Sequence, residues 1–345
     1  MPTQKALVHK SKGVAEIISD APLPTLRDDY INVRTKAVAL NPTDWKSLYG
    51  RTVPGAISGC DYSGIVEAVG KAVTNGLKVG DRVAGLVHGA NQENHEDGAF
   101  AEHITSKGGL QLKLADHVTF EEAATLGVGV TTVAQGLYQS LGLPLPPSKV
   151  QERISILIYG ASTATGTLAV QFAKLSGCEV IATASPRNFD LVRKLGADQV
   201  FDYRAPDVGS KIREATNDGL ALVFDCISEG SSPSICCDAI GSAGGKYSAL
   251  LKVAELPRDD VSNTLTLAYT AFGENFAAHQ YNLPANKEDY EFASKFWKIT
   301  EGLLNEGKIK AHPAKVMDGL GSIPGGLQDL KDGKVSGEKL VYRVE

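Results

Sequence analysis

The sequence lacks the features that mark several common classes of protein. Its five cysteines form no CxxC pair and no spacing typical of a disulfide framework. No stretch approaches the roughly 20 apolar residues needed to cross a bilayer, and no apolar signal region precedes the strand-like segment Ala6-Leu7-Val8. The formal charge of −5 disfavours binding to nucleic-acid phosphates, which requires a basic surface. We therefore expect a cytoplasmic protein that binds neither nucleic acid nor membrane.

The first part of the chain is rich in short strands. The 345 residues exceed the size of a single typical core, so two domains are expected. Residues 1–125 alternate short apolar segments with glycine, proline and aspartate, which is typical of a compact β-barrel. The expected strands are Lys5–Val8, Tyr30–Leu40, Gly64–Val69, Arg82–Leu86 and Ala99–Ile104.

Residues 126–274 alternate strands with helices instead. The first strand, Ile154–Tyr159, is followed by a glycine-flanked turn and a helix at Thr165–Leu175. The alternation continues to a strand at Leu220–Asp225. This βαβαβ order predicts a parallel sheet with helices on both of its faces.

The pattern changes again near residue 275. Asn286 is expected to cap a helix, and residues 339–344 alternate as a closing strand. The expected fold is therefore α/β. One domain consists of residues 1–125 and 275–345, and a doubly wound domain consists of residues 126–274.

The turn after the first strand of the second domain has features of a dinucleotide site. Backbone N–H groups at the start of the following helix can hold a pyrophosphate. The segment departs from the G-x-G-x-x-G fingerprint because Ser162 stands at the second glycine position, so a turn with only a packing role is the alternative. The βαβ order favours cofactor binding. The predicted contacts are Gly160, Ser162, Thr163, Ala164 and Thr165.

The end of the second strand favours NADPH over NADH. An NAD site usually has Asp or Glu about 20 residues past the glycine turn, where it binds the ribose 2′-hydroxyl. Here Ala184 and Ser185 occupy that region, and Arg187 follows. A hydroxyl and a guanidinium suit a 2′-phosphate, whereas a solvated arginine at a helix start is the alternative. Asn188 and Tyr203 are further predicted contacts, although Tyr203 can also be a simple rim residue.

Three motifs resemble the medium-chain dehydrogenase/reductase superfamily. They are Ala39-Leu40-Asn41-Pro42-Thr43-Asp44-Trp45, Gly59-Cys60-Asp61-Tyr62-Ser63-Gly64 with Val66, Val69 and Gly70, and Gly80-Asp81-Arg82-Val83. The resemblance covers nearly the whole chain and implies a GroES-like catalytic domain followed by a Rossmann domain, with the cofactor between them. It also implies cofactor contacts from Pro42, Asp44, Phe272 and Gly273.

The chain differs from the zinc alcohol dehydrogenases of that superfamily at the metal-ligand positions. Their ligands are a cysteine, a histidine–glutamate pair and a second cysteine, and the matching positions here are Asn41, Cys60-Asp61 and Val128. A catalytic zinc ion needs about three N, S or O protein ligands in one tetrahedral arrangement. This set does not supply them, so no metal is expected.

Five further motifs are similar to the trans-acting enoyl reductases of fungal polyketide pathways. This resemblance implies NADPH-dependent reduction of an α,β-unsaturated thioester held on the carrier domain of a partner synthase, and it favours a monomer. The motifs are Asn41-Pro42-Thr43-Asp44-Trp45-Lys46, Ser162-Thr163-Ala164-Thr165, Ser185-Pro186 with Asn188-Phe189-Asp190-Leu191, Phe201-Asp202-Tyr203-Arg204-Ala205-Pro206 and Ser336-Gly337-Glu338-Lys339-Leu340-Val341.

Three residues are candidates for catalysis. Without a metal, hydrogen-bond donors must stabilise the charge that grows on the carbonyl oxygen as hydride reaches the β-carbon. Lys46 matches a lysine linked to catalysis in the trans-acting reductases and is expected on a loop that faces the nicotinamide, unless it is an ordinary surface lysine. Thr131 is expected to bind the nicotinamide or the acyl carbonyl, or else to cap a helix. Tyr62 is expected to donate to the enolate, or else to lie in the barrel core.

Two other functions remain open at this point. A stand-alone reductase of quinones or free enones would have the same fold and cofactor. A catalytically silent NADPH-binding scaffold would keep the cofactor turn alone. The sequence does not distinguish acyl chain lengths or partner synthases.

Overall fold

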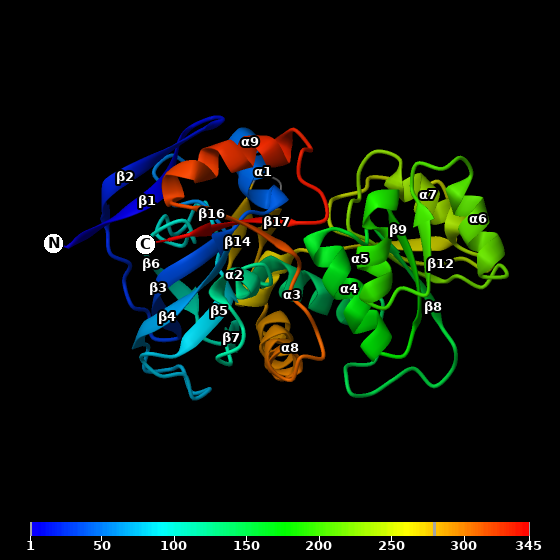
Figure 1. Cartoon of the computed structure of the whole chain (residues 1–345), viewed down its shortest axis with the longest axis horizontal. Helices are drawn as coiled ribbons and strands as arrows, with labels where there is room; N and C mark the ends of the chain where they lie inside the picture. Colours follow the sequence, from blue (N-terminus) through cyan, green and yellow to red (C-terminus); the bar gives the residue numbers. More distant parts are fainter. Residues whose placement is uncertain (1, 279–280, 345) are drawn as a thin grey trace. The chain divides into compact units, whose positions relative to one another are not determined.

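The computed structural model describes residues 2–278 and 281–344 and divides into two compact units. Unit 1 consists of Met1–Val128 and Tyr269–Glu345, and unit 2 consists of Gly129–Ala268. Figure 1 labels the elements of both units. Among the described residues, no helix is long and apolar enough to cross a membrane.

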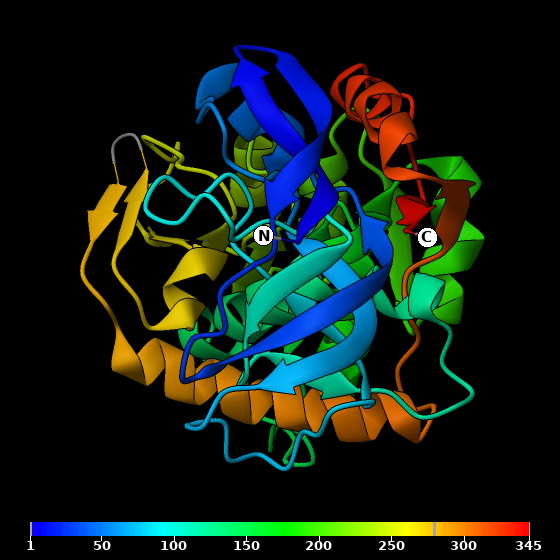
Figure 2. The ribbon, with the colours of Figure 1, turned by 90° about the vertical axis from the view of Figure 1, so that its left-hand side faces the viewer.

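Unit 1 is built on mostly antiparallel strands that curve around an apolar core, with β16 and β17 paired in parallel. One sheet has the order β16-β17-β3-β4-β5-β7, with β6 also paired to β3, and β1 and β2 form a separate hairpin. Figure 2 looks onto these strands and onto the long helix α8 beside them. The strands are β1 (Thr3–Ser11), β2 (Val14–Pro22), β3 (Tyr30–Ala39), β4 (Asp61–Val69), β5 (Arg82–Leu86), β6 (His103–Lys107), β7 (Gln111–Lys113), β14 (Phe276–Ala278), β15 (Tyr281–Leu283), β16 (Ala314–Asp318) and β17 (Lys339–Arg343).

The helices of unit 1 lie around this barrel. The N-cap of α8 is Asn286, whose side chain accepts the Asp289 N–H as predicted, and Asn305 near its end bonds the backbone of β7. The helices are α1 (Pro42–Gly50), α2 (Phe120–Ala123), α8 (Lys287–Asn305) and α9 (Ile323–Lys331), with short 3₁₀ turns at Ala268–Phe272 and Leu320–Ser322. Helix α3 (Gly127–Val133) follows α2 and runs into a π-helical segment, Ala134–Ser140.

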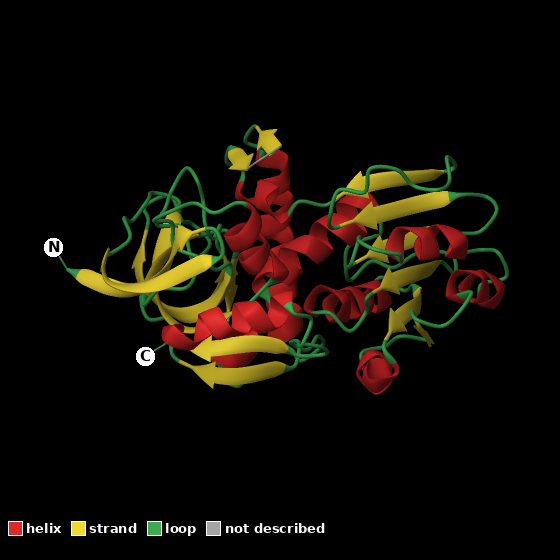
Figure 3. Ribbon diagram, turned by 90° about the horizontal axis from the view of Figure 1, so that it is seen from above, coloured by secondary structure: helices red, strands yellow, loops and turns green. Residues whose placement is uncertain are grey.

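Unit 2 is a parallel sheet with the strand order β10-β9-β8-β11-β12-β13. Helices α4 and α5 cover one face and α6 and α7 cover the other, as Figure 1 shows, and Figure 3 draws helices and strands in separate colours from above. This doubly wound arrangement confirms the predicted α/β fold class. The elements are β8 (Ser155–Tyr159), α4 (Ala164–Leu175), β9 (Glu179–Ala184), α5 (Phe189–Lys194), β10 (Gln199–Asp202), α6 (Val208–Ala215), β11 (Leu222–Asp225), α7 (Ser232–Ala239), β12 (Gly245–Ala249) and β13 (Val261–Leu265), with a 3₁₀ turn at Pro186–Asn188.

One predicted strand is wrong in position. The expected strand Ala99–Ile104 is mostly loop, and β6 begins only at His103. The apolar residues before it are used in another way, because the Leu7 N–H donates to the Phe100 carbonyl at 2.8 Å and Ala6 forms an isolated bridge with Ala101. These contacts fasten β1 to the barrel, so the apolar pattern here reflects burial rather than a continuous strand.

A buried ion pair joins the last strand of unit 1 to its centre. The Lys339 ammonium donates to Asp61 Oδ2 at 2.5 Å, to Asn41 Oδ1 at 2.9 Å and to the Thr125 carbonyl at 3.3 Å. The other oxygen of Asp61 accepts the Val128 N–H at 2.7 Å. Lys339 is 4% exposed and Asp61 0%. All three ammonium protons therefore have acceptors, which is what a buried lysine requires.

We expect Lys339→Met to destabilise unit 1 by about 3–5 kcal/mol, because it leaves the Asp61 carboxylate buried without its cation. Combining it with Asp61→Asn removes the uncompensated charge, so the double variant should recover part of this loss. Urea unfolding of the single and double variants measures both effects.

The control is Lys287→Met, which breaks the exposed ion pair with Glu291 on α8. That change should cost no more than about 0.5 kcal/mol. A loss from Lys339→Met as small as that of the control would contradict a structural role for the buried pair.

Candidate functional site

The order in which strands are added to the parallel sheet of unit 2 reverses between β8 and β11. Strands β9 and β10 follow β8 to one side, whereas β11, β12 and β13 lie on its other side. In open parallel sheets, ligands bind beyond the carboxyl ends of the strands at such a switch point. The loops that leave β8 and β11 are therefore the first place to look for a cofactor site.

The loop after β8 is a tight turn into helix α4. Gly160 has φ of +75°, and a Cβ there would lie 2.8 Å from a side-chain carbon of Ile227, so both the backbone and the packing require glycine. The Thr163 hydroxyl caps α4 by accepting the Gly166 N–H at 2.9 Å. Ala164 and Thr165 form the first turn of α4, where unpaired backbone N–H groups favour an anion.

The predicted 2′-phosphate residues lie beyond β9. Asn188 donates to the hydroxyls of Ser162 and Ser185, both at 3.2 Å, and so links the end of β9 to the β8–α4 turn. Arg187 is exposed, and no ion pair or hydrogen bond joins its guanidinium to any residue that the structure describes. Tyr203, 40% exposed after β10, meets Tyr159 edge-on with ring centroids 6.4 Å apart. The structure thus brings these residues to one edge of the sheet.

The sequence analysis missed the loop on the other side of the switch point. The fully buried Asp225 carboxylate accepts hydrogen bonds from the Ile227 and Ser228 N–H groups and from the Ser232 and Tyr247 hydroxyls, at 2.6–2.9 Å. Ser228 has φ of +57°. An aspartate directly after an apolar strand was the available signal for this loop.

In unit 1, the segment that carries Lys46 is a helix and not the predicted loop. Helix α1 has Asn41 at its N-cap, Pro42 at its first position and Asp44 in its first turn. These are three signals of a helix start. Asp44 Oδ2 accepts the Asn41 N–H at 2.7 Å. Lys46 is half-buried on α1, with its ammonium 5.6 Å from the centre of the Trp45 ring.

A chain of buried polar groups runs from the start of α1 into the barrel. The Thr43 hydroxyl lies 3.0 Å from the Tyr269 hydroxyl, which lies 3.5 Å from the Cys60 sulfur. Burial, helped by the charge of Asp61 and opposed by the Asn41 N–H, raises the pKa of Asp44 to about 7.

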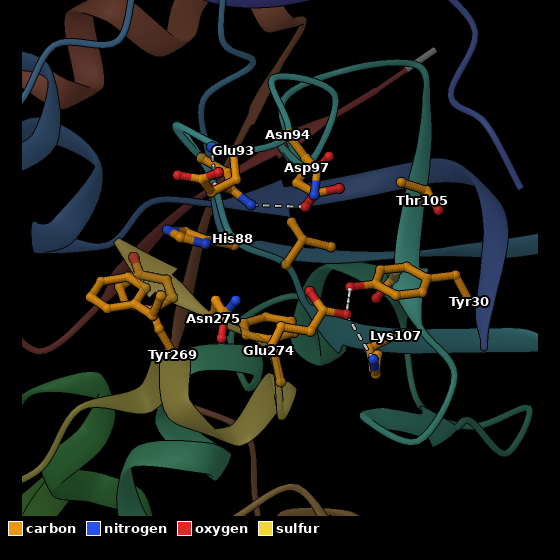
Figure 4. Close-up of a pocket in the computed structure, with 15 residues that line it drawn as sticks. Tyr30, His88, Glu93, Asn94, Asp97, Thr105, Lys107, Tyr269, Glu274 and Asn275 are labelled. Carbon is orange, nitrogen blue, oxygen red and sulfur yellow. Dashed lines mark hydrogen bonds and ion pairs between the residues drawn. The ribbon is translucent and has the colours of Figure 1, made fainter. Parts of the chain in front are cut away.

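Beside this chain lies a small, partly open pocket in unit 1. Figure 4 shows His88 near Tyr269 on one side and Tyr30, Lys107 and Glu274 on the other. Its apolar lining includes Val87, Phe272 and Phe276, each no more than 5% exposed. The space inside it that is open to water is about 30 Å³, which is room for only one or two water molecules.

The remaining predicted residues have different surroundings. Tyr62 lies in the barrel core, 0% exposed, and donates its hydroxyl to Gln111 Oε1 at 2.6 Å. Thr131 is fully buried inside α3, so the alternative that it is a helix N-cap is wrong. Phe272 lines the pocket of unit 1, and Gly273 follows it with φ of +67°.

The residues at the metal-ligand positions do not fit a catalytic zinc ion. Asn41 and Asp61 direct their side-chain oxygens at the Lys339 ammonium, which is itself a cation. Val128 has no ligating atom in its side chain, so Cys60 alone remains. Burial raises the pKa of the Cys60 thiol well above its usual value, which opposes the thiolate that zinc requires.

Family comparisons define the class of protein. Residues 27–125 match the alcohol dehydrogenase GroES-like domain, and residues 164–247 match the zinc-binding dehydrogenase family. Together with the barrel of unit 1 and the doubly wound sheet of unit 2, these matches show a medium-chain dehydrogenase/reductase.

Within this superfamily, the chain belongs to the fungal trans-enoyl reductases. It is 59% identical to the trans-enoyl reductase ACTTS2 of Alternaria alternata over the full length of both chains. It is 47% identical to the trans-enoyl reductase resD of Aspergillus sclerotiorum over 99% of this chain and 100% of that one. The family expectation drawn from the motifs is therefore confirmed.

Solved structures agree on the fold. The CurK enoyl reductase superposes with a TM-score of 0.80 at 21% identity, with all of both chains covered. The quinone oxidoreductase of Coxiella burnetii superposes with a TM-score of 0.74 at 22% identity, again over all of both chains. At this identity, enoyl and quinone reductases share one architecture, so the fold does not separate their substrates.

The pKa of Asp44 predicts a pH-dependent stability. The pKa is about 7 in the folded state and about 3.9 in an unfolded chain, so folding favours the protonated carboxyl. Its contribution to stability is present below pH 4 and is lost as the pH rises to 7. Asp44→Asn does not titrate. Across this window its free energy of unfolding should therefore rise relative to that of the wild type by up to about 1.4 kcal/mol per pH unit.

Urea unfolding of both proteins between pH 4 and 8 measures this difference. The exposed Asp116→Asn serves as the control and should follow the wild type throughout. If the free energies of unfolding of Asp44→Asn and the wild type change in parallel with pH, Asp44 is ionised when buried.

Proposed function

We propose that this chain is an NADPH-dependent enoyl reductase that acts in trans on an α,β-unsaturated thioester carried by a partner polyketide synthase. The observation that carries the proposal is the 59% identity, over the full length of both chains, to a protein named trans-enoyl reductase. The fold, the cofactor edge of unit 2 and the absence of a zinc ligand set among the described residues all agree with it.

The proposed cofactor site is the edge of unit 2 that includes Gly160, Ser185 and Arg187. The α4 N-terminus suits the pyrophosphate, and the unpaired Arg187 guanidinium with the Ser185 hydroxyl suits a 2′-phosphate. Tyr203 has an exposed ring on which an adenine can stack. When bound, NADPH supplies the hydride that reduces the β-carbon.

Two residues are proposed to act on the substrate. Lys46 provides a cationic donor from α1, which can stabilise the negative charge that develops on the thioester carbonyl. Thr131 provides a hydroxyl from α3 that orients the carbonyl or the nicotinamide amide. Tyr62 has its proton committed to Gln111 inside the barrel, so it is the weaker of the three candidates.

The proposed partner is the carrier domain that holds the acyl thioester, with the reductase itself a monomer in the cytoplasm. A reducing compartment suits the five cysteines, all of which are free thiols. Carrier delivery also distinguishes the proposed reaction from reduction of a free quinone, which needs no partner.

The function is tested by NADPH oxidation with three substrates: an enoyl thioester on a carrier domain, crotonyl pantetheine and a simple quinone. We expect turnover of both thioesters and little of the quinone. Lys46→Ala should lower kcat and kcat/KM together, by about 10²–10³-fold if Lys46 is an oxyanion donor. A rise in KM with constant kcat would instead assign Lys46 to substrate binding.

The control for Lys46 is Lys71→Ala, which removes an exposed lysine that pairs with Asp28. Faster turnover of the quinone than of either thioester would favour the stand-alone reductase. Cofactor binding without turnover of any substrate would favour the silent scaffold.

Cofactor choice is tested with Arg187→Ala. We expect this variant to weaken NADPH binding by about 1.5–3 kcal/mol, the range for a hydrogen bond to a charged group, and to leave NADH binding nearly unchanged. Titration of each cofactor by fluorescence or calorimetry measures both. Arg193→Ala removes a nearby exposed arginine of α5 and should change neither affinity. Equal losses for both cofactors would show that Arg187 does not contact the 2′-phosphate.

A further inference from the structure

In the part of the chain that the structure describes, the segment Tyr269–Phe276 of unit 1 is not part of the barrel sheet. It consists of most of the 3₁₀ turn Ala268–Phe272 and of the loop that leads to β14, and β14 pairs with β15 in a separate two-stranded sheet. Side-chain contacts therefore have to help hold this 269–276 segment against the barrel. Within it lie Phe272 and Gly273, two of the cofactor contacts that the sequence predicts.

The carboxylate of Glu274 joins the 269–276 segment to two strands of the barrel. One of its oxygens accepts the Tyr30 hydroxyl at 2.5 Å and the Lys107 ammonium at 2.7 Å (Figure 4). Tyr30 begins β3 and Lys107 ends β6, where the two residues lie opposite each other in the antiparallel pair. Both are no more than 5% exposed. Two buried donors thus converge on one oxygen and define the position of the Glu274 side chain closely.

Neutralising the buried Lys107 does not require Glu274. Asp29 also pairs with the Lys107 ammonium, at 2.6 Å. The side chain of Glu274 is 36% exposed, so water can hydrate it if the bonds to the barrel are lost. A pair of this kind adds little to stability, but a network of directed hydrogen bonds restricts the positions that a segment can adopt.

The other end of the 269–276 segment contacts the start of α1. The Tyr269 hydroxyl lies 3.0 Å from the Thr43 hydroxyl. The Tyr269 ring also stacks on that of Phe276, with the ring centroids 5.1 Å apart and the planes 8° from parallel. Thr43 is in the first turn of α1, the helix that also contains Lys46. A displacement of the segment would therefore reach this helix as well as the predicted cofactor contacts.

We propose that Glu274 is a positioning residue: by fixing the 269–276 segment on the barrel, it sets the position of Phe272 and Gly273 relative to the nicotinamide end of the cofactor. Glu274 acts through these residues and does not touch the reacting atoms. This inference rests on the proposed function and its predicted cofactor contacts, and it adds a residue that acts through them.

The test compares the binding of NADPH with that of 2′,5′-ADP, which keeps the adenosine and the 2′-phosphate but lacks the nicotinamide. Glu274→Ala should weaken NADPH binding by about 3- to 10-fold, the scale of one lost neutral hydrogen bond, and leave 2′,5′-ADP binding unchanged. It should lower kcat by about 10- to 100-fold, because a small misplacement of reacting groups has an effect of this size. Calorimetry measures both affinities.

Amide hydrogen exchange provides a readout without any ligand. Exchange in the 269–276 segment should become faster in Glu274→Ala, whereas exchange in β8 of unit 2 should stay as in the wild type. Unchanged exchange in the segment would show that the bonds of Glu274 do not hold it, which overturns the inference.

The binding measurements separate this inference from the proposed function. If NADPH binds but no thioester is reduced, the proposed function fails, and the two affinities still test Glu274. If thioesters are reduced and Glu274→Ala keeps both affinities and kcat at the wild-type level, the inference is overturned and the proposed function stands. Equal losses for both ligands also overturn it, because a general change of structure would then explain them.

The matched control is Glu67→Ala. The side chain of Glu67 is 38% exposed and forms ion pairs with Arg34 and His103, away from the 269–276 segment. This variant should keep both affinities and kcat. Thermal unfolding identifies any variant that fails to fold. If Glu274→Ala does so, Tyr30→Phe combined with Glu274→Gln decides alone, because it removes the hydroxyl donor and the carboxylate charge at nearly constant volume. Wild-type NADPH affinity and kcat in this double variant overturn the proposal.

Discussion

The Lys339 ammonium holds together three parts of unit 1 that are far apart in the sequence. It bonds the N-cap residue of α1, the carboxylate that begins β4 and the backbone just before α3. Burying two charges costs several kcal/mol per ion, so the pair is tolerable only because all three ammonium protons and both carboxylate oxygens are hydrogen-bonded. The residues that resemble metal-ligand positions thus bind a cation that the chain itself supplies. The start of α1, and with it Lys46, is fixed without a metal.

Unit 2 also buries a charged group, the carboxylate of Asp225. Among the described residues no cation pairs with Asp225, and four N–H and O–H donors stabilise its two oxygens instead. Those bonds hold the loop after β11 in a conformation that includes the positive φ of Ser228. The Cys226 N–H in that loop donates to the carbonyl of Tyr159, directly before the β8–α4 turn, at 3.0 Å. The two loops at the switch point therefore support each other, and an anion at the α4 N-terminus would meet a rigid site.

What the sequence predicted well were features set by local chemistry. The apolar run before Gly160, the Asn286 cap and the alternation at the C-terminal strand each depend on residues a few positions apart. The start of α1 also has local signals, in Asn41, Pro42 and Asp44. The loop was nevertheless predicted there because the family resemblance implied one.

Long-range contacts could not be predicted in the same way. The partners of Lys339 lie up to 298 positions away in the sequence, and nothing near Lys339 distinguishes it from a surface lysine. The pocket of unit 1 has the same character, since its walls come from β3, from the loop after β5, from β6 and from the segment around Phe272. Only the folded barrel shows that Thr105 is buried without a partner.

The buried polar groups of this molecule differ in how completely they are hydrogen-bonded. Asp61, Asp225 and Lys339 are buried and fully bonded, as groups that stabilise a fold must be. The Ser58 and Thr105 hydroxyls are also buried but have no partner among the described residues, and each such group costs about 1–3 kcal/mol. Stability alone would replace them with apolar residues.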